Sequence, residues 1–171
     1  MKPHAERLKR LGTETAFEVL AKAKALEAQG KEIIHMEIGE PDFDTPAYIK
    51  QAAKEALDQG YTHYTPSAGI MSVRQTIADY MSETRGIPIK PENIVIVPGG
   101  KPIMFYTIMA LVDPGDEVIY PNPGFPIYES MINFMDGVAV PLPLREEREF
   151  SFDVDEFKSL VTPRTKLIII N

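Results

Sequence analysis

The chain has 171 residues, of which 44% are hydrophobic and 25% charged, the balance of a soluble globular protein with a real core. Eighteen Lys and Arg stand against 25 Asp and Glu, so the net charge of -7 disfavours nucleic acid as a partner. No cysteine is present, which excludes disulfides, thiolate metal sites and a cysteine nucleophile. The basic opening is not followed by an apolar segment of signal-peptide or membrane-spanning length, so we expect a cytoplasmic protein with no membrane partner.

The first elements predicted along the chain are a helix and a short strand. Apolar residues at helical spacing predict the helix over 16–28, with Thr13 or Thr15 as its cap and Gly30 as its terminator. The apolar run that follows predicts a strand over 33–38, and the loop after it is rich in turn formers.

Two further helices are expected before residue 90. Thr45 followed by Pro46 is typical of a helix cap with proline at the first helical position, and Gly60 would end this helix. The next helix is predicted over 70–83, with a stop at Gly86.

From residue 91 onward, short apolar runs alternate with helical segments of about ten residues, the pattern of right-handed βαβ units. Strands are expected at 94–97, 117–120, 138–142 (interrupted by Pro141) and 166–170, with helices at 102–111, 124–134 and 153–161. We therefore predict an α/β fold with a doubly wound, mostly parallel sheet between two layers of helices. Residues 1–45 are expected to form an arm and part of a small domain, and 46–171 the larger α/β domain.

The stretch VIVPGGKP is a candidate phosphate site, because a predicted strand leads through Gly99 and Gly100 into a helix that opens near Pro102. Two glycines allow the backbone to approach a ligand closely, and the amides at a helix start suit an anion. The spacing does not match a P-loop or a GxGxxG pattern. A tight turn that only needs small residues remains the alternative.

Two loops carry aromatic candidates. In HYTPSAG, Tyr64 lies among turn formers, so its hydroxyl is either presented to a ligand or another subunit, or half-buried for structural reasons. In YPNPGFP, Phe125 follows a strand end in a stiff loop, where it either stacks on a planar ring or packs into the core.

These stretches together resemble the pyridoxal-phosphate-dependent aminotransferases of fold type I, the aspartate aminotransferase superfamily of class I and II. The motifs occur in the family's order over essentially the whole chain: IGEPDF, YTPSAG, PGGK, DPGDEVIYPNPGFPIY and TPRTKLIIIN. The resemblance implies pyridoxal 5'-phosphate as cofactor, an amino acid and a 2-oxo acid as substrates, and a homodimer. It also implies that 46–171 is an incomplete cofactor-binding domain and that the chain is the amino-terminal portion, under half, of such an enzyme.

Residue by residue, the resemblance assigns the cofactor phosphate to the backbone of Gly99, Gly100 and Lys101, and the face of the pyridine ring to Phe125. The side chain of Lys101 is not expected to form the Schiff base. The residue at the position of Phe125 is often Tyr or Trp elsewhere in the family.

The same resemblance assigns the substrate carboxylate to the amide of Gly39, and the phosphate of the neighbouring subunit's cofactor to the hydroxyl of Tyr64. The cofactor-binding Asn of the family comes a few positions after Asn171. The family's Asp under the pyridine nitrogen, Tyr on the ring oxygen, Schiff-base Lys and carboxylate-binding Arg also come later. We therefore predict no catalytic residue in these 171 residues, and no activity from them alone.

Two rival functions stay open at this stage. Fold type I also includes carbon–sulfur lyases with similar amino-terminal halves, and a non-catalytic ligand-binding module on the same fold is a third possibility. No metal site is expected, because His4, His35 and His63 show no pattern of partners for metal or triad chemistry.

Overall fold

The computed structural model describes residues 4–12 and 15–171, which fall into two compact units. One unit combines the chain up to Ile38 with Gly99–Asn171, and the other is Gly39–Pro98. The predicted boundary at residue 45 concerns the domains of a longer protein, and it stays a prediction. None of the helices in the described ranges is long and apolar enough to cross a membrane.

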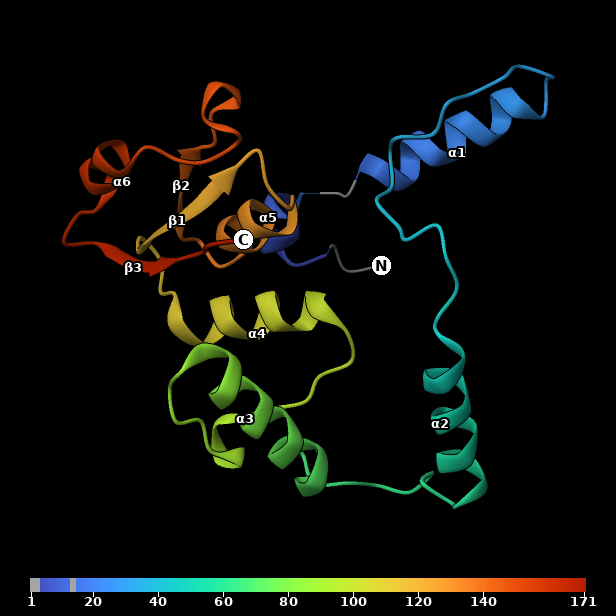
Figure 1. Cartoon of the computed structure of the whole chain (residues 1–171). Helices are drawn as coiled ribbons and strands as arrows, with labels where there is room; N and C mark the ends of the chain where they lie inside the picture. Colours follow the sequence, from blue (N-terminus) through green and yellow to red (C-terminus); the bar gives the residue numbers. More distant parts are fainter. Residues whose placement is uncertain (1–3, 13–14) are drawn as a thin grey trace. The chain divides into compact units, whose positions relative to one another are not determined.

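A three-stranded parallel sheet forms the centre of the first unit (Figure 1). Its strands are β1 (Glu117–Asn122), β2 (Val138–Pro143) and β3 (Thr165–Ile168), in the order β2-β1-β3. The parallel α/β sheet predicted from the sequence is therefore confirmed. The chain leaves β1 for β2 on one side and then returns past β1 to β3 on the other.

Helices cover both faces of this sheet, as a doubly wound fold requires. Right-handed crossovers that run in opposite directions along a sheet place their helices on opposite faces, so α5 (Ile127–Phe134) and α6 (Val154–Leu160) lie on different sides. Helix α4 (Gly100–Leu111) packs against α5. The core between these two helices and the sheet consists of apolar side chains from all three: Ile108, Val112, Val118, Tyr120, Tyr128, Met131 and Ile132.

The amino-terminal segment of the first unit contacts α5. It contains a short 3-10 helix, η1 (Glu6–Arg10), and α1 (Thr15–Glu27). The Arg10 guanidinium donates to the carbonyl oxygens of Asn133 (3.0 Å) and Phe134 (3.3 Å). The proposed cap Thr13 lies outside the described residues.

The strand predicted over 33–38 is wrong, because these residues form no ladder with another strand in the described part of the chain. The apolar pattern there indicates β propensity, but a strand also needs a neighbouring strand that accepts its hydrogen bonds.

The second unit contains helices α2 (Ala47–Asp58) and α3 (Met71–Arg85) and the 3-10 turn η2 (Pro91–Asn93). The predicted stop of α3 at Gly86 is confirmed, since Gly86 adopts the left-handed conformation with φ +66. The predicted Thr45 cap is wrong: Pro46 occupies the N-cap of α2 and no side chain caps this end.

The strand predicted over 94–97 is also not formed, and local contacts use its backbone instead. The Ile96 N–H donates to the carbonyl of Ala68 at 3.0 Å, and Arg74 Nε donates to the carbonyl of Ile94 at 2.9 Å. Since no ladder partner is present in the described part of this unit, the segment remains irregular.

Two details after residue 137 bear on the sequence predictions. Strand β2 continues through Pro141, contrary to the expected interruption, because β2 is an edge strand and Pro141 pairs with Tyr120 without needing a second neighbour. A short 3-10 turn, η3 (Glu146–Arg148), follows β2. Asp153 then caps α6 as predicted, accepting from the amides of Asp155 (2.8 Å) and Glu156 (2.9 Å).

Candidate active site

The start of α4 is open to a ligand. Gly99, the N-cap residue, has φ +89 and ψ 176, a conformation that favours glycine, and no side chain caps the helix. A Cβ built on Gly99 or Gly100 would meet no atom within 4 Å, and both residues are exposed. The backbone amides and positive end of the helix dipole at such a start suit a phosphate or carboxylate, so the donor set fits an anionic group.

The side chain of Lys101 points away from the backbone start of α4 toward the amino-terminal segment. Its Nζ lies 5.7 Å from the centroid of the Phe17 ring, within cation–π range. The backbone of Lys101 belongs to the first turn of α4. The backbone of Lys101 therefore lies at the open helix start, whereas its side chain lies beside Phe17.

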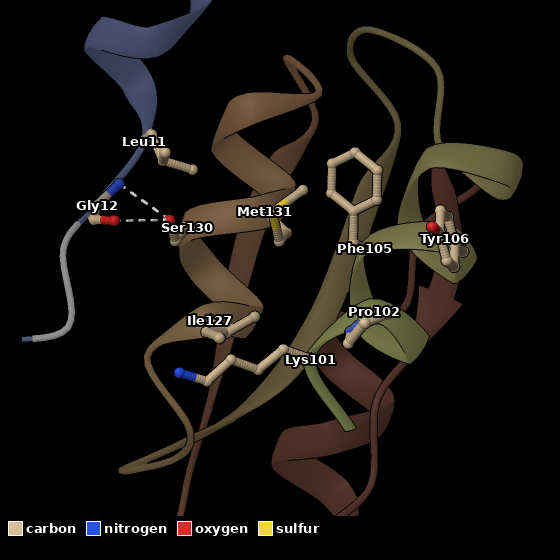
Figure 2. A pocket seen from close by; sticks show the side chains of 9 residues that line it. All are labelled: Leu11, Gly12, Lys101, Pro102, Phe105, Tyr106, Ile127, Ser130 and Met131. Atoms are coloured by element: carbon tan, nitrogen blue, oxygen red, sulfur yellow. Dashed lines mark hydrogen bonds between the residues drawn. The ribbon is translucent and has the colours of Figure 1, made fainter. Parts of the chain in front are cut away.

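A cavity of about 410 Å³ lies beside this helix start (Figure 2). It is lined by the amino-terminal segment, α4 and α5 through Leu11, Gly12, Lys101, Pro102, Phe105, Tyr106, Ile127, Ser130 and Met131. Ser130 Oγ is engaged by Gly12, whose N–H donates to it at 2.9 Å and whose carbonyl accepts from it at 3.2 Å. The lining is mostly apolar, and Lys101 is the predicted site residue that it includes.

The carboxyl ends of β1 and β3 form a second part of the candidate site. The chain turns back after β2 and places β3 on the other side of β1, and in α/β folds a crevice opens between two such neighbouring strands at their carboxyl ends. Phe125 follows β1 in a loop where Gly124 is required, because a Cβ there would collide with the carbonyl oxygen of Pro121. Phe125 is half-buried and packs against the core.

Sequence reasoning missed a contact that joins these two strand ends. The rings of Phe125 and Tyr128 meet edge to face, with centroids 5.8 Å apart and planes at 87°. The Tyr128 hydroxyl donates to Asn171 Oδ1 at 3.1 Å. The two residues are 43 positions apart, so no local pattern could have indicated the bond.

The remaining predicted site residues, Gly39 and Tyr64, belong to the second unit. Tyr64 is fully exposed and lines a cavity of about 270 Å³ together with Gly60, Tyr61, His63, Thr65, Pro66 and Ile70. The loop depends on Gly69, which has φ +98 and whose Cβ would lie 2.5 Å from Ile96 Cγ1. Gly39 is exposed, with room for an approaching group.

His35, Tyr120 and Glu117 are among the ionisable groups whose pKa values are shifted. Hydrogen bonds that the imidazole of His35 donates to the carboxylates of Glu37 (2.6 Å) and Glu27 (2.8 Å) raise the pKa of His35, a pairing that sequence reasoning did not find. Burial raises the pKa of Tyr120 to about 12, so this phenol is neutral near pH 7. Hydrogen bonds from Thr162 and Arg164 lower the pKa of Glu117, at the amino ends of the strands and away from the candidate site.

A metal centre is not supported by the acidic and histidine side chains that the structure describes. No group of three or more His, Asp or Glu residues in the described ranges is placed to hold a metal ion.

Comparison with known proteins places this geometry in a family. The family described as aminotransferase class I and II matches residues 31–171. The chain is 42% identical over 167 residues to a probable aspartate/prephenate aminotransferase of Aquifex aeolicus, which covers 98% of this chain and 42% of that protein. It is 37% identical over 171 residues to the aspartate/prephenate aminotransferase of Thermus thermophilus, covering 100% of this chain and 44% of that protein.

Solved structures agree with the sequence relatives. The aspartate aminotransferase from Thermus thermophilus with maleate superposes with a TM-score of 0.92 at 36% identity, covering 99% of this chain and 44% of that one. The alanine aminotransferase from Pyrococcus furiosus gives 0.90 at 28% identity, covering 97% and 43%. The chain thus spans under half the length of these relatives. Its match over 31–171 shows that the chain belongs to the class I and II aminotransferase family.

Proposed function

We propose that the chain is the amino-terminal part of a pyridoxal-phosphate-dependent aminotransferase that moves an amino group between an amino acid and a 2-oxo acid. The observation that carries the proposal is the open, glycine-lined start of α4 inside the region that matches the family. Because the relatives are named for aspartate and prephenate, L-aspartate is the first amino donor to test. We place the complete enzyme in the cytoplasm as a homodimer.

The residues at the start of α4 would hold the phosphate of the cofactor. The conformation of Gly99 and the empty space around Gly100 let an anion reach the backbone amides of the first turn, including that of Lys101. Pyridoxal phosphate, once bound, supplies the electron sink for a negative charge at the α-carbon of the substrate. Phe125 would give the pyridine ring an aromatic wall, since it follows the carboxyl end of β1.

The second unit would supply the contacts to the substrate and to the neighbouring subunit. The amide of exposed Gly39 would donate to the substrate carboxylate. The hydroxyl of Tyr64 would reach the phosphate of the partner's cofactor, and its full exposure leaves it available for such a contact. This assignment makes the homodimer necessary for a complete site.

We assign the proton-transfer step to residues of the complete enzyme that are not among the 171 described by this sequence. The 171-residue chain alone should therefore show no transaminase activity, and borohydride reduction in the presence of pyridoxal phosphate should label no single lysine stoichiometrically. Stoichiometric labelling of Lys101 would contradict its assignment as a backbone ligand.

Tyr64→Phe in the complete enzyme tests the site. Loss of a hydrogen bond to a charged group costs roughly 1.5 to 3 kcal/mol, so cofactor affinity should fall about ten- to a hundredfold. Tyr61→Phe is the matched control, because Tyr61 lines the same cavity and is also exposed. Equal affinity of the Tyr64→Phe variant and wild type would remove Tyr64 from the site.

A mixed dimer tests whether Tyr64 acts across the subunit boundary. One subunit carries Tyr64→Phe and the other a disabled Schiff-base lysine. If Tyr64 acts in trans, one site has both defects and the other has none, so roughly half the activity of wild type remains. If Tyr64 acts in cis, each site carries one defect, so at a pyridoxal phosphate concentration too low to saturate the Tyr64→Phe site the activity falls well below half that of wild type, and the trans assignment is wrong.

A further inference from the structure

Tyr128 connects the two strand ends that border the candidate cofactor site. Its ring meets Phe125 edge to face, and its hydroxyl donates to the side chain of Asn171. Phe125 follows the carboxyl end of β1, and Asn171 follows that of β3. A single side chain on α5 therefore contacts residues that follow both of these neighbouring strands.

The contacts of Tyr128 go beyond what packing alone requires. The residue is 3% exposed, and a phenylalanine would fill the same core space. A buried hydroxyl needs a partner, and here the partner is the side chain of Asn171, which follows β3. The bond therefore uses a core side chain to orient a polar group at the rim of the candidate site.

The orientation of each partner follows from these contacts. With Oδ1 accepting from Tyr128, the carboxamide of Asn171 is held in one orientation at the end of β3. The perpendicular ring of Tyr128 limits the tilt of Phe125, which is otherwise only half-buried. Groups that bind a planar ligand work best when their own rotamers are fixed by such supporting contacts.

We propose that Tyr128 is a positioning residue for the cofactor ring. It sets the tilt of Phe125 and ties the end of β3 to α5, so that the aromatic wall and the chain beyond Asn171 are held in place before the ligand binds. The inference rests on the proposed function, because it assumes that Phe125 faces the pyridine ring. It assigns Tyr128 no direct contact with the cofactor.

The test compares Tyr128→Phe and Asn171→Ala with wild type in the complete enzyme. The readouts are the affinity for pyridoxal phosphate and the circular dichroism of the bound cofactor's absorption band, which reports how its ring is held. Loss of one neutral hydrogen bond should weaken cofactor binding by about two- to tenfold in either variant. Because both variants break the same bond, the double variant should bind the cofactor with no lower affinity than the single variant that has the lower affinity of the two.

Tyr120→Phe is the matched control, since it removes the hydroxyl of another buried tyrosine of the same core, 7% exposed, which lies on β1. We expect its cofactor affinity and circular dichroism to equal those of wild type. Should Tyr128→Phe fail to fold, Asn171→Ala carries the test, because it breaks the same bond and leaves the Tyr128 side chain in place.

The outcomes separate this inference from the function on which it rests. Wild-type enzyme that does not bind pyridoxal phosphate overturns both. If the wild type binds pyridoxal phosphate, and Tyr128→Phe and Asn171→Ala have the same affinity and dichroism as the wild type, the proposed function stands and the positioning role is overturned. Equal changes in Tyr128→Phe and Tyr120→Phe also overturn it, because they would reflect general loosening of the core. Additive losses in the double variant would contradict the shared bond.

Discussion

Residues 99–171 and residues 39–98 both contain well-formed helices, but they bury very different amounts of apolar side chain. Helices α4 and α2 have 12 residues each, yet α4 packs into the core beneath the sheet whereas α2 buries none of its residues. Apart from Ala23 and Ala78, every buried apolar side chain in the described ranges lies within 99–171.

The difference shows how each region is stabilised. In a βαβ segment the helix packs on the strands that precede and follow it, so residues close in sequence enclose a core together. Residues 39–98 lack such strands, and many of their large apolar side chains stay exposed, among them Tyr48, Leu57, Tyr61, Tyr64 and Val95. Further burial of these side chains would have to come from surfaces outside the unit.

The largest effect should come from deleting a core side chain. Ile132→Ala on α5 removes a residue that is 0% exposed and should lower the free energy of unfolding by about 2 to 5 kcal/mol. Leu57→Ala on α2, where Leu57 is 62% exposed, should change it by no more than about 0.5 kcal/mol. Urea denaturation of the 171-residue chain measures both, and similar losses would erase the contrast between the regions.

Gly69 is the position where the second unit should be sensitive to substitution. Gly69→Ala places a Cβ 2.5 Å from Ile96 Cγ1 at a φ of +98, so we expect a cost of about 1 to 3 kcal/mol. Gly60→Ala is the control, because Gly60 also has positive φ but meets nothing within 4 Å. Thermal unfolding should show a larger drop for Gly69→Ala, and equal drops would show that backbone strain alone matters.

A smaller, pH-dependent effect is expected at the amino ends of the strands. Glu117 is 4% exposed and accepts from Thr162 Oγ1 (2.5 Å) and from the guanidinium of Arg164 (Nε at 2.8 Å). Because these bonds hold the pKa of Glu117 below its ordinary 4.5, their contribution is present above that value and lost as pH falls through the lowered pKa.

The variant Arg164→Ala should lower stability near pH 7 and flatten its acid dependence. Lys158→Ala is the control, because Lys158 pairs with Asp155 on the surface. Stability measured from pH 7 down to about 3 in both variants checks this. An acid dependence in Arg164→Ala as steep as in wild type would show that Arg164 does not contribute to the lowered pKa of Glu117.

The smallest effect concerns His35, which is exposed between Glu27 and Glu37. Its pKa is raised above 6.5, so its contribution to stability is present below that value and is lost as pH rises through the raised pKa. NMR titration of the imidazole should give a pKa above 6.5 in wild type and a lower one in Glu37→Gln. Unchanged titration in that variant would show that Glu37 is not its main partner.

The sequence predicts the first unit well for physical reasons. Each strand of the sheet lies next to its crossover helix in the chain, so periodicity and turn residues specify both. The cap at Asp153 is equally local, as its acceptor serves amides two and three residues away. The glycine-rich start of α4 follows from residue types alone, because only glycine tolerates φ +89 without strain.

What the sequence could not predict depends on distant partners. The segments 33–38 and 94–97 have strand-like patterns, but a pattern does not supply a neighbouring strand. The Tyr128 to Asn171 bond and the pairing of His35 with Glu27 likewise join residues whose separation in sequence carries no signal. Thr45 resembles a cap by type, yet the backbone at Pro46 begins the helix without it.

The most direct test of the proposed function follows the amino group itself. The complete enzyme, loaded with pyridoxal phosphate, is mixed with nitrogen-15-labelled L-aspartate and an unlabelled 2-oxo acid, and the products are analysed by mass spectrometry. We predict that the label appears in the amino acid formed from the 2-oxo acid, with aspartate converted to its own 2-oxo acid. Label that stays in aspartate with every 2-oxo acid tried, while a sulfur-containing amino acid is cleaved to release ammonia, would contradict the assignment as an aminotransferase.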